Sequence, residues 1–316
     1  MNTNETILGS IDPDVAERLA TSSEEIAQGR TTSSRVMSGL AMASVPIALA
    51  ALSRDAFGQA PNTVLGVLNF ALALEIFENE FYKAVLGISS SATQNAAFAT
   101  VRAQVLAMAP QAVPALQQIQ KHETAHVAFL MGAGATNVFN LNADAFDFTG
   151  ARGAGNGPFA RATVELPFLL LVAQGAEDTG VRAYKGQAPV IQATGNTAVL
   201  EYALRIHSVE ARHASKIRRL RRQTGATTVK YSGTITGASA GAENISSPPA
   251  GAVAGLGLIY AGEDNVTQGG VNVTSLPNLP ASNFNANNAA TEAFDEPLTR
   301  AQVVAIVQPF FIPTVA

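Results

Sequence analysis

Four glutamates set in apolar helical stretches place the strongest constraint on how this chain can fold. Two of them are followed by a histidine three residues on, and an i, i+3 pair presents both side chains on one face of a helix. In chain order these residues are Glu75, Glu123 with His126, Glu177, and Glu210 with His213. Four carboxylates buried together without positive charge would be very costly, so the helices that carry them are expected to meet around a compensating charge.

Two divalent cations would supply that charge, because they bring four positive charges to four carboxylates. Oxygen and imidazole ligands without thiolate suit iron or manganese, and zinc is compatible with them. The chain has no cysteine, which excludes disulfides, thiolate metal sites and a cysteine nucleophile. The sequence therefore predicts two iron or manganese ions held by these four glutamates and two histidines.

Two tyrosines repeat one spacing relative to these acids. Tyr82 follows Glu75, and Tyr184 follows Glu177, by seven residues, which is two helical turns on the same face. As catalytic residues, the tyrosines would hydrogen-bond a ligand carboxylate or pass an electron. As structural residues, they would be buried side chains whose hydroxyls find a carboxylate. Asp178 is expected in solvent or beside a ligand.

The remaining acids and histidines of these helices are assigned by the face on which they fall. Glu75 is expected to point inward because apolar residues flank it, whereas Glu78 lies on a neighbouring face and Glu80 is offset by five residues. His207 shares the face of the second Glu-x-x-His pair and would be a partner of a ligand or a further ligand. His122 is expected at the surface.

The segments that carry these residues resemble the ferritin-like superfamily, and most closely the desiccation-related ferritin-like domain family of bacteria and plants. They read LNFALALEIFENEFY, HETAHVAFL, AEDTGVRAYKGQA and RIHSVEARHASKIR, and the resemblance covers about residues 60–225. It implies an all-α fold, a ferritin-like four-helix bundle with one long crossover between the second and third helices.

Periodicity and helix breakers indicate where the helices of this bundle begin and end. They are expected at about 63–86, 114–132, 158–185 and 197–223, with a further helical stretch at about 97–108. Pro167 is expected to bend the third helix, and residues 186–196 to form a turn and a short connection. Gly175 would allow close helix approach. The crossover at 133–157 is expected to be anchored on the bundle by Phe139, Phe146 and Phe148.

Three segments are expected along the chain: an N-terminal helical and apolar extension at 1–60, the bundle at 61–224, and a low-charge extended tail at 225–316. The tail is expected to end in a helix at about 296–307, and its stretches VKYSGTITG and LGLIYAG are compatible with short strands. The apolar run at 35–52 is broken by Pro46. Three interpretations of it stay open: a packed helix, a degenerate export signal, or a membrane-associated segment. Cytoplasmic and exported locations are both open.

Composition favours association between copies of the chain. Apolar residues make up 47% and charged residues only 14% of it, which suggests large buried surfaces, an oligomer or an apolar environment. A homo-oligomer formed through the N-terminal apolar segment and the C-terminal tail is therefore expected. The net charge of −4 gives no argument for nucleic acid, and the basic run at 216–222 is expected to complement the C-terminal end of its helix dipole.

Two bound metals would imply a redox function. The resemblance to ferritins implies iron oxidation, and that to manganese catalases and rubrerythrins implies peroxide removal, with dioxygen or peroxide as substrate and a role in oxidative or desiccation stress. A rubredoxin-like electron relay is not supported, because the chain lacks cysteine. Two alternatives stay open: a self-assembling structural protein with a vestigial metal site, and a module that binds lipid or pigment in the bundle.

Overall fold

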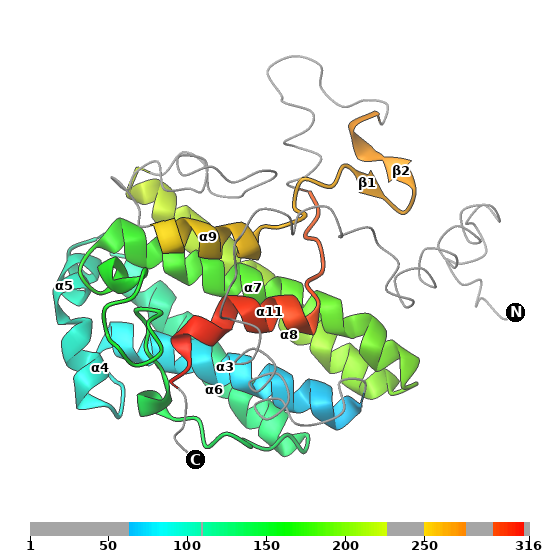
Figure 1. Cartoon of the computed structure of the whole chain (residues 1–316), viewed down its shortest axis with the longest axis horizontal. Helices are drawn as coiled ribbons and strands as arrows, with labels where there is room; N and C mark the ends of the chain where they lie inside the picture. The colour runs from blue at the N-terminus through cyan, green and yellow to red at the C-terminus, as the bar shows by residue number, and fades with distance from the viewer. Residues whose placement is uncertain (1–62, 109, 226–249, 276–292, 313–316) are drawn as a thin grey trace, which may run out of the picture.

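Four long helices lie side by side at the centre of the molecule (Figure 1). The computed structural model describes residues 63–108, 110–225, 250–275 and 293–312 of the 316-residue chain. The bundle helices are α3 (Val64–Leu86), α6 (Ala112–Gly132), α7 (Leu166–Ala193) and α8 (Thr197–Gln223). The expected four-helix bundle with its long second connection is thereby confirmed. The N-terminal extension and the stretch VKYSGTITG lie outside the described residues.

The bundle is built from two helix pairs, because α3 packs chiefly against α6 and α7 chiefly against α8. Only residues 194–196 separate α7 from α8, so these two helices run antiparallel. Every residue of α3 from 66 to 82 is buried, which is the pattern of a helix covered on all sides. Glu75 lies in the middle of this buried stretch and is therefore inside the core.

Both ends of α3 match the expected boundaries and have local causes. The side chain of Thr63 accepts a hydrogen bond from the backbone N–H of Gly66 at 3.0 Å, which is an N-cap. Gly87 ends the helix with a φ of 76°, in the left-handed region that glycine enters without strain. The guanidinium of Arg102 donates to the last carbonyls, those of Ala84 and Val85.

Two short helices follow α3 before the second bundle helix begins. They are α4 (Ala92–Ala97) and α5 (Ala99–Ala107). Gln104 of α5 accepts a hydrogen bond from the N–H of Leu166 at 3.0 Å, so a side chain from α5 satisfies a free donor at the start of α7.

The predicted limits of the third bundle helix are wrong at both ends. A short 3₁₀ turn, η4 (Ala160–Thr163), precedes α7, and Pro167 lies in the first turn of α7 instead of bending it. A proline is tolerated there because that N–H has no helical partner. The segment predicted as a turn continues the helix through Ala193. Its Gly186 permits a close contact, since a Cβ there would come within 1.9 Å of the Leu298 carbonyl oxygen.

Aromatic side chains anchor the crossover, as expected. Phe146 and Phe148 are fully buried, and Phe139 packs against the core. The crossover also contains η3 (Ala143–Ala145). It lies against η6 (Gln308–Phe310), and Phe146 forms an antiparallel β-bridge with Phe311, the residue after η6. The N–H of Asp147 donates to the Phe310 carbonyl at 2.7 Å. The end of the chain thus holds the crossover against the bundle.

The described part of the tail packs on the bundle of its own chain. It contains α9 (Ala250–Ile259), a hairpin of β1 (Thr267–Gln268) and β2 (Val271–Asn272), η5 (Val273–Ser275) and α11 (Arg300–Val307). Figure 1 shows α9 and α11 lying over α7 and α3. The terminal helix begins later than expected, after a capping box formed by Thr299 and Gln302. Association of the tail with a second copy stays a prediction.

The prediction that LGLIYAG forms a strand is wrong, because α9 continues through Ile259. Small residues explain why α9 can lie so close to its neighbours. A Cβ at Gly175 of α7 would lie 2.9 Å from Ile259, and one at Gly255 would lie 2.8 Å from the ring of Phe159. The expectation that Gly175 allows close helix approach is thereby confirmed.

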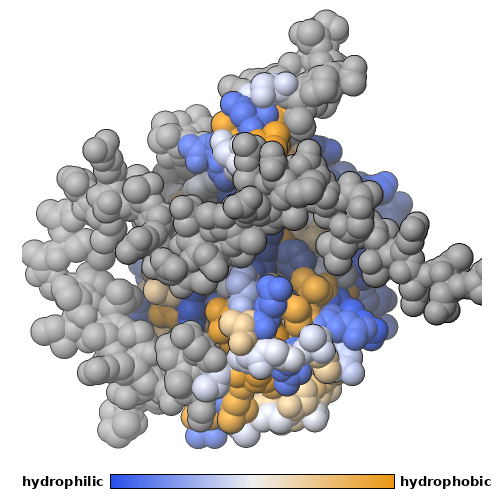
Figure 2. Space-filling view, turned by 90° about the vertical axis from the view of Figure 1, so that its right-hand side faces the viewer, coloured by the Kyte–Doolittle hydropathy of each residue, from blue (hydrophilic) through white to orange (hydrophobic). Residues whose placement is uncertain are grey.

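Among the helices of the described residues, none is long and apolar enough to cross a bilayer. Figure 2 shows the end of the bundle at which α3 begins and α7 passes into α8, with hydrophobic and hydrophilic residues mixed on the described surface.

Candidate metal centre

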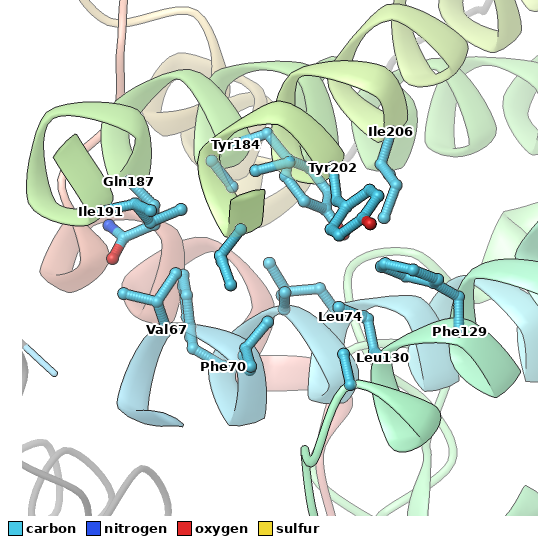
Figure 3. A pocket seen from close by; sticks show the side chains of 16 residues that line it. Val67, Phe70, Leu74, Phe129, Leu130, Tyr184, Gln187, Ile191, Tyr202 and Ile206 are labelled. Carbon is cyan, nitrogen blue, oxygen red and sulfur yellow. The ribbon is translucent and has the colours of Figure 1, made fainter. Parts of the chain in front are cut away.

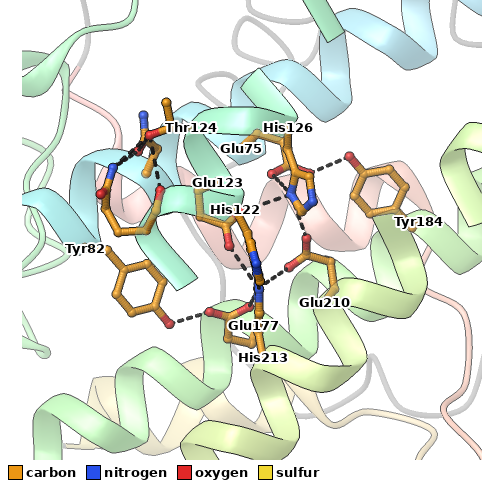
Figure 4. A network of polar contacts seen from close by, with 12 residues as sticks. Glu75, Tyr82, His122, Glu123, Thr124, His126, Glu177, Tyr184, Glu210 and His213 are labelled. Atoms are coloured by element: carbon orange, nitrogen blue, oxygen red, sulfur yellow. Dashed lines mark hydrogen bonds and ion pairs between the residues drawn. The ribbon is translucent and has the colours of Figure 1, made fainter. Parts of the chain in front are cut away.

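Each of the four bundle helices carries part of one buried cluster of carboxylates and imidazoles (Figure 4). Its members are Glu75 on α3, Glu123 and His126 on α6, Glu177 on α7, and Glu210 and His213 on α8. His126 is the most exposed member, at 9%, and the four glutamates are each at 1% or less. The structure therefore brings all six predicted metal ligands together. Whether they bind metal stays a prediction.

The imidazole of His126 faces three carboxylates. Its Nδ1 lies 3.0 Å from Glu75 Oε2, 3.1 Å from Glu210 Oε1 and 3.3 Å from Glu123 Oε2. Each of these oxygens comes from a different helix, so the contacts tie α3, α6 and α8 together.

The imidazole of His213 has an equivalent environment. Its Nδ1 lies 2.9 Å from Glu123 Oε1, 3.3 Å from Glu177 Oε2 and 3.5 Å from Glu210 Oε2. Glu123 and Glu210 thus reach both imidazoles, whereas Glu75 reaches only His126 in these contacts, and Glu177 only His213. The six residues form two overlapping groups of four, and within each group the ligand atoms all lie within 4.8 Å of one another.

Two tyrosines hold the outer carboxylates. The hydroxyl of Tyr82 on α3 donates to Glu177 on α7, and the hydroxyl of Tyr184 on α7 donates to Glu75 on α3. Burial, followed by the charges of the adjacent glutamates, raises the pKa of both tyrosines well above its usual range. Both hydroxyls therefore stay protonated and act as donors.

The metal-free cluster carries its positive charge on the imidazoles. Burial disfavours the charged form of His126, but hydrogen bonds to Glu123, Glu210 and Glu75 outweigh it and raise the pKa of His126 to about 12. Burial likewise opposes protonation of His213, but the charge of Glu177 and close contacts with the surrounding carboxylates raise its pKa. Burial alone would raise the pKa of Glu210, but its contacts with both imidazoles outweigh burial and lower this pKa to about 2.

Several buried polar atoms of the cluster have no hydrogen-bond partner of normal geometry within the described structure. They are Glu123 Oε1, Glu177 Oε2, both carboxylate oxygens of Glu210, and His213 Nδ1. Buried acceptors without donors are costly and rare in native proteins. Cations bound among these atoms would satisfy them, and carboxylate with imidazole is a donor set of iron, manganese and zinc proteins. The residues therefore fit a pair of metal ions.

Two further side chains lie closer to the cluster than the sequence predicted. His122 was expected at the surface, but its Nδ1 lies 2.8 Å from His213 Nε2, and the two rings stack 12° from parallel. Its spacing of four residues from His126 is the signal that places it on the same side of α6. Glu78 is 4% exposed, and burial followed by the charges of Glu210 and the other acids raises its pKa well above its usual range.

Two other assignments are settled by their partners. Asp178 is not solvated: its carboxylate is buried and accepts hydrogen bonds from Arg218, Gln174 and the Tyr260 hydroxyl. Asp178 therefore helps to bind the tail to α7, through the hydroxyl of Tyr260. His207 directs Nδ1 to the Val181 carbonyl oxygen at 3.0 Å and belongs to neither group of candidate ligands.

A helical bundle that gathers four carboxylates and two imidazoles at its centre defines a helical-bundle protein with a candidate metal site. The sequence profile of the ferritin-like domain matches residues 63–223, about half of the chain. The chain belongs to the ferritin-like domain family. No curated protein and no solved structure matches it at a significant level. The resemblance to the desiccation-related family stays a prediction.

Proposed function

We propose that this protein is a ferritin-like oxidoreductase that holds two iron or manganese ions and uses them to oxidise iron or to remove peroxide. One observation carries the proposal: two imidazoles each face three carboxylates, and two of the carboxylates serve both imidazoles. This is a donor set for two adjacent cations. Its completeness supports a working site over a vestigial one in a purely structural bundle.

The chain's own residues would bind and orient the two ions. Glu75 with His126 would hold one ion, Glu177 with His213 would hold the other, and the remaining two glutamates would lie between them. Iron or manganese bound there would supply a one-electron change at each of two neighbouring positions. The burial of the cluster excludes bulk water, and low dielectric strengthens its electrostatic contacts.

The tyrosines have a defined task in this proposal. Each hydroxyl donates to the outer carboxylate of the opposite helix, so it fixes which carboxylate oxygen is left for a cation. A ligand held in place by an outer hydrogen bond tunes metal affinity. Tyr82 and Tyr184 are therefore proposed as positioning residues. Tyr→Phe variants distinguish this role from the alternative, in which the tyrosines pass an electron.

Two reactions are compatible with the site. In iron oxidation, two Fe(II) ions are substrates that give up one electron each, and dioxygen takes up these electrons with two protons to give hydrogen peroxide. In peroxide removal, two hydrogen peroxide molecules yield dioxygen and two water molecules. Either reaction would serve protection against oxidative or desiccation stress, which is the physiological role we propose.

Metal analysis of the full chain tests the proposal. We expect the protein reconstituted without oxygen to bind two equivalents of iron or manganese, and the Glu123→Ala/His213→Ala variant to lose them. Glu201→Gln is the matched control, because Glu201 lies on α8 as well but is exposed and pairs with Arg205. A folded wild-type chain that binds neither metal would refute the proposal and favour the structural alternative.

A further inference from the structure

A chamber lies between the bundle and the tail. Its inner wall is formed by α3 and α7, and its outer wall by α9, α11 and the segment of Phe310. About 570 Å³ of space without protein atoms lies between these walls, open solvent at the mouth included. The outer wall comes from residues beyond the 63–223 match to the ferritin-like domain, so the chamber depends on this chain's own tail.

The chamber lies next to the candidate metal centre at a glycine. Gly180 of α7 lines it, and a Cβ at this position would lie 3.3 Å from Glu78 Oε1 and 3.5 Å from Glu210 Oε2. Glu210 is one of the two shared carboxylates, and its Oε2 is the oxygen that faces His213 Nδ1 at 3.5 Å. Because Gly180 has no side chain, the chamber and the shared carboxylate are in direct proximity there.

Glu78 is the ionisable side chain that lines the chamber. It is 4% exposed, and it forms no hydrogen bond or ion pair within the described parts of the chain. The other polar side chain of the wall is Thr179, whose hydroxyl already donates to the Gly175 carbonyl. A molecule in the chamber therefore meets apolar carbon almost everywhere and one carboxyl group at the inner end.

We propose that this chamber is the route by which dioxygen, and not hydrogen peroxide, reaches the metal centre, with Glu78 and Gly180 at its inner end. Dioxygen is uncharged and carries no hydroxyl group, so it loses little on leaving water for apolar walls. Hydrogen peroxide has two hydroxyls, and burying a hydroxyl without a partner is unfavourable. This inference rests on the two-metal function proposed above and selects its oxidant.

A second apolar pocket offers a comparison within the same chain (Figure 3). It lies between the four bundle helices and is lined by Val67, Phe70, Tyr202 and Val199, among others. Tyr184 stands between this pocket and Glu75, and its hydroxyl is engaged by that glutamate. In this pocket a tyrosine side chain, and not a glycine, lies beside the candidate ligand, which makes the pocket a control.

Matched substitutions test the route. Val307→Phe fills the chamber from α11, and Val199→Phe fills the second pocket from α8, and neither residue belongs to the metal centre. With both variants loaded to the wild-type iron content, we expect Val307→Phe to slow Fe(II) oxidation at limiting dioxygen by roughly tenfold, the effect of a modest added barrier. Val199→Phe should match the wild type. Equal rates in the two variants would overturn the route.

Xenon gives a readout that needs no metal, because apolar cavities bind it. We expect xenon in the chamber of the wild type and of Val199→Phe, and none in the chamber of Val307→Phe. Should Val307→Phe fail to fold, Gly180→Ala replaces it in the kinetic assay, since its methyl group would fill the space beside Glu210. An unchanged dioxygen dependence in Gly180→Ala would then refute the route.

The same assay with hydrogen peroxide shows which oxidant travels through the chamber. With hydrogen peroxide supplied in place of dioxygen, we expect Val307→Phe to react as fast as the wild type. An equal slowing with both oxidants would overturn the selection of dioxygen. These failures differ from failure of the two-metal function, which would show as a folded chain without bound iron or manganese.

Discussion

The hydroxyl of Tyr184 on α7 donates a hydrogen bond to Oε1 of Glu75 on α3. The converse contact runs from Tyr82 on α3 to Glu177 on α7. Each of the two helices thus supplies a carboxylate and the tyrosine that orients the carboxylate of the other helix. The identical seven-residue spacing on both helices makes this exchange possible, and it gives the two halves of the centre equivalent surroundings.

Removal of either tyrosine hydroxyl is expected to weaken the fold. Tyr82→Phe or Tyr184→Phe would leave a buried carboxylate oxygen without its donor, at a cost of about 1–3 kcal/mol each. Urea unfolding of the metal-free variants measures this loss. Tyr202→Phe, at a tyrosine that is 39% exposed, is the control and should stay within about 0.5 kcal/mol of the wild type.

The same variants separate the two roles considered for the tyrosines. A positioning role predicts weaker metal binding with a nearly normal oxidation rate once the metal is loaded. A role in passing an electron predicts normal metal content and a lost tyrosyl signal in rapid-freeze electron paramagnetic resonance. Variants with unaltered stability, metal content and spectra would contradict both.

Metal binding should release protons at neutral pH. Hydrogen bonds to carboxylates overcome burial and raise the pKa of His126 to about 12, so the metal-free imidazole is protonated, and that proton must leave before a nitrogen can bind a cation. Affinity should therefore fall as pH falls. Calorimetric titrations in two buffers of different ionisation enthalpy measure the release, and identical heats in both would contradict it.

Asp147 should make stability depend on acid pH. Burial opposes its ionisation, but hydrogen bonds from the Thr149 hydroxyl and from the N–H groups of Gly155, Gly153 and Thr149 lower its pKa below the ordinary 3.8. A lowered folded-state pKa gives stability that is present above the unfolded pKa and lost as pH falls through the folded one.

Asp147→Asn tests this contribution. The substitution would place an amide NH₂ among N–H donors and is expected to cost about 1–3 kcal/mol at pH 7. The difference from the wild type should shrink as pH falls below the ordinary pKa of an aspartate. Thermal unfolding across this pH range measures it, and a difference that is independent of pH would contradict the assignment.

The tail should depend on one buried ion pair. Arg182 Nε lies 3.0 Å from Glu263 Oε1, with the two side chains 2% and 1% exposed, and the same guanidinium donates to carbonyls of α9 and of the segment before α11. Glu263→Gln would leave the arginine charge buried without its carboxylate, at a cost of about 3–5 kcal/mol.

The surface pair of Arg205 and Glu201, 68% and 60% exposed, provides the comparison for Glu263→Gln. Glu201→Gln is expected to cost at most about 1 kcal/mol. Limited proteolysis should cut the tail of Glu263→Gln faster than that of Glu201→Gln. Equal stability and equal cleavage of the two variants would show that this ion pair does not hold the tail.

Sequence patterns predicted the bundle and its ligands because their signals are local. The i, i+3 and i, i+7 spacings fix which side chains share a face, whatever the helix packs against. The ends of α3 are also set locally, by the Thr63 cap and by Gly87. The ends of α7 escaped prediction because they depend on distant partners, Gln104 at the start and the tail at Gly186.

The sequence by itself determined which residues are candidate ligands and on which helices they lie, since a helix of 3.6 residues per turn converts spacing into direction. Only the tertiary structure decided that Glu123 and Glu210 are the shared carboxylates and that His122 reaches His213. It also decided that α9 is a helix and forms part of the outer wall of the chamber. These features depend on how far each helix is rotated and how closely the backbones approach. Packing between segments far apart in the chain sets both, and no local pattern records it.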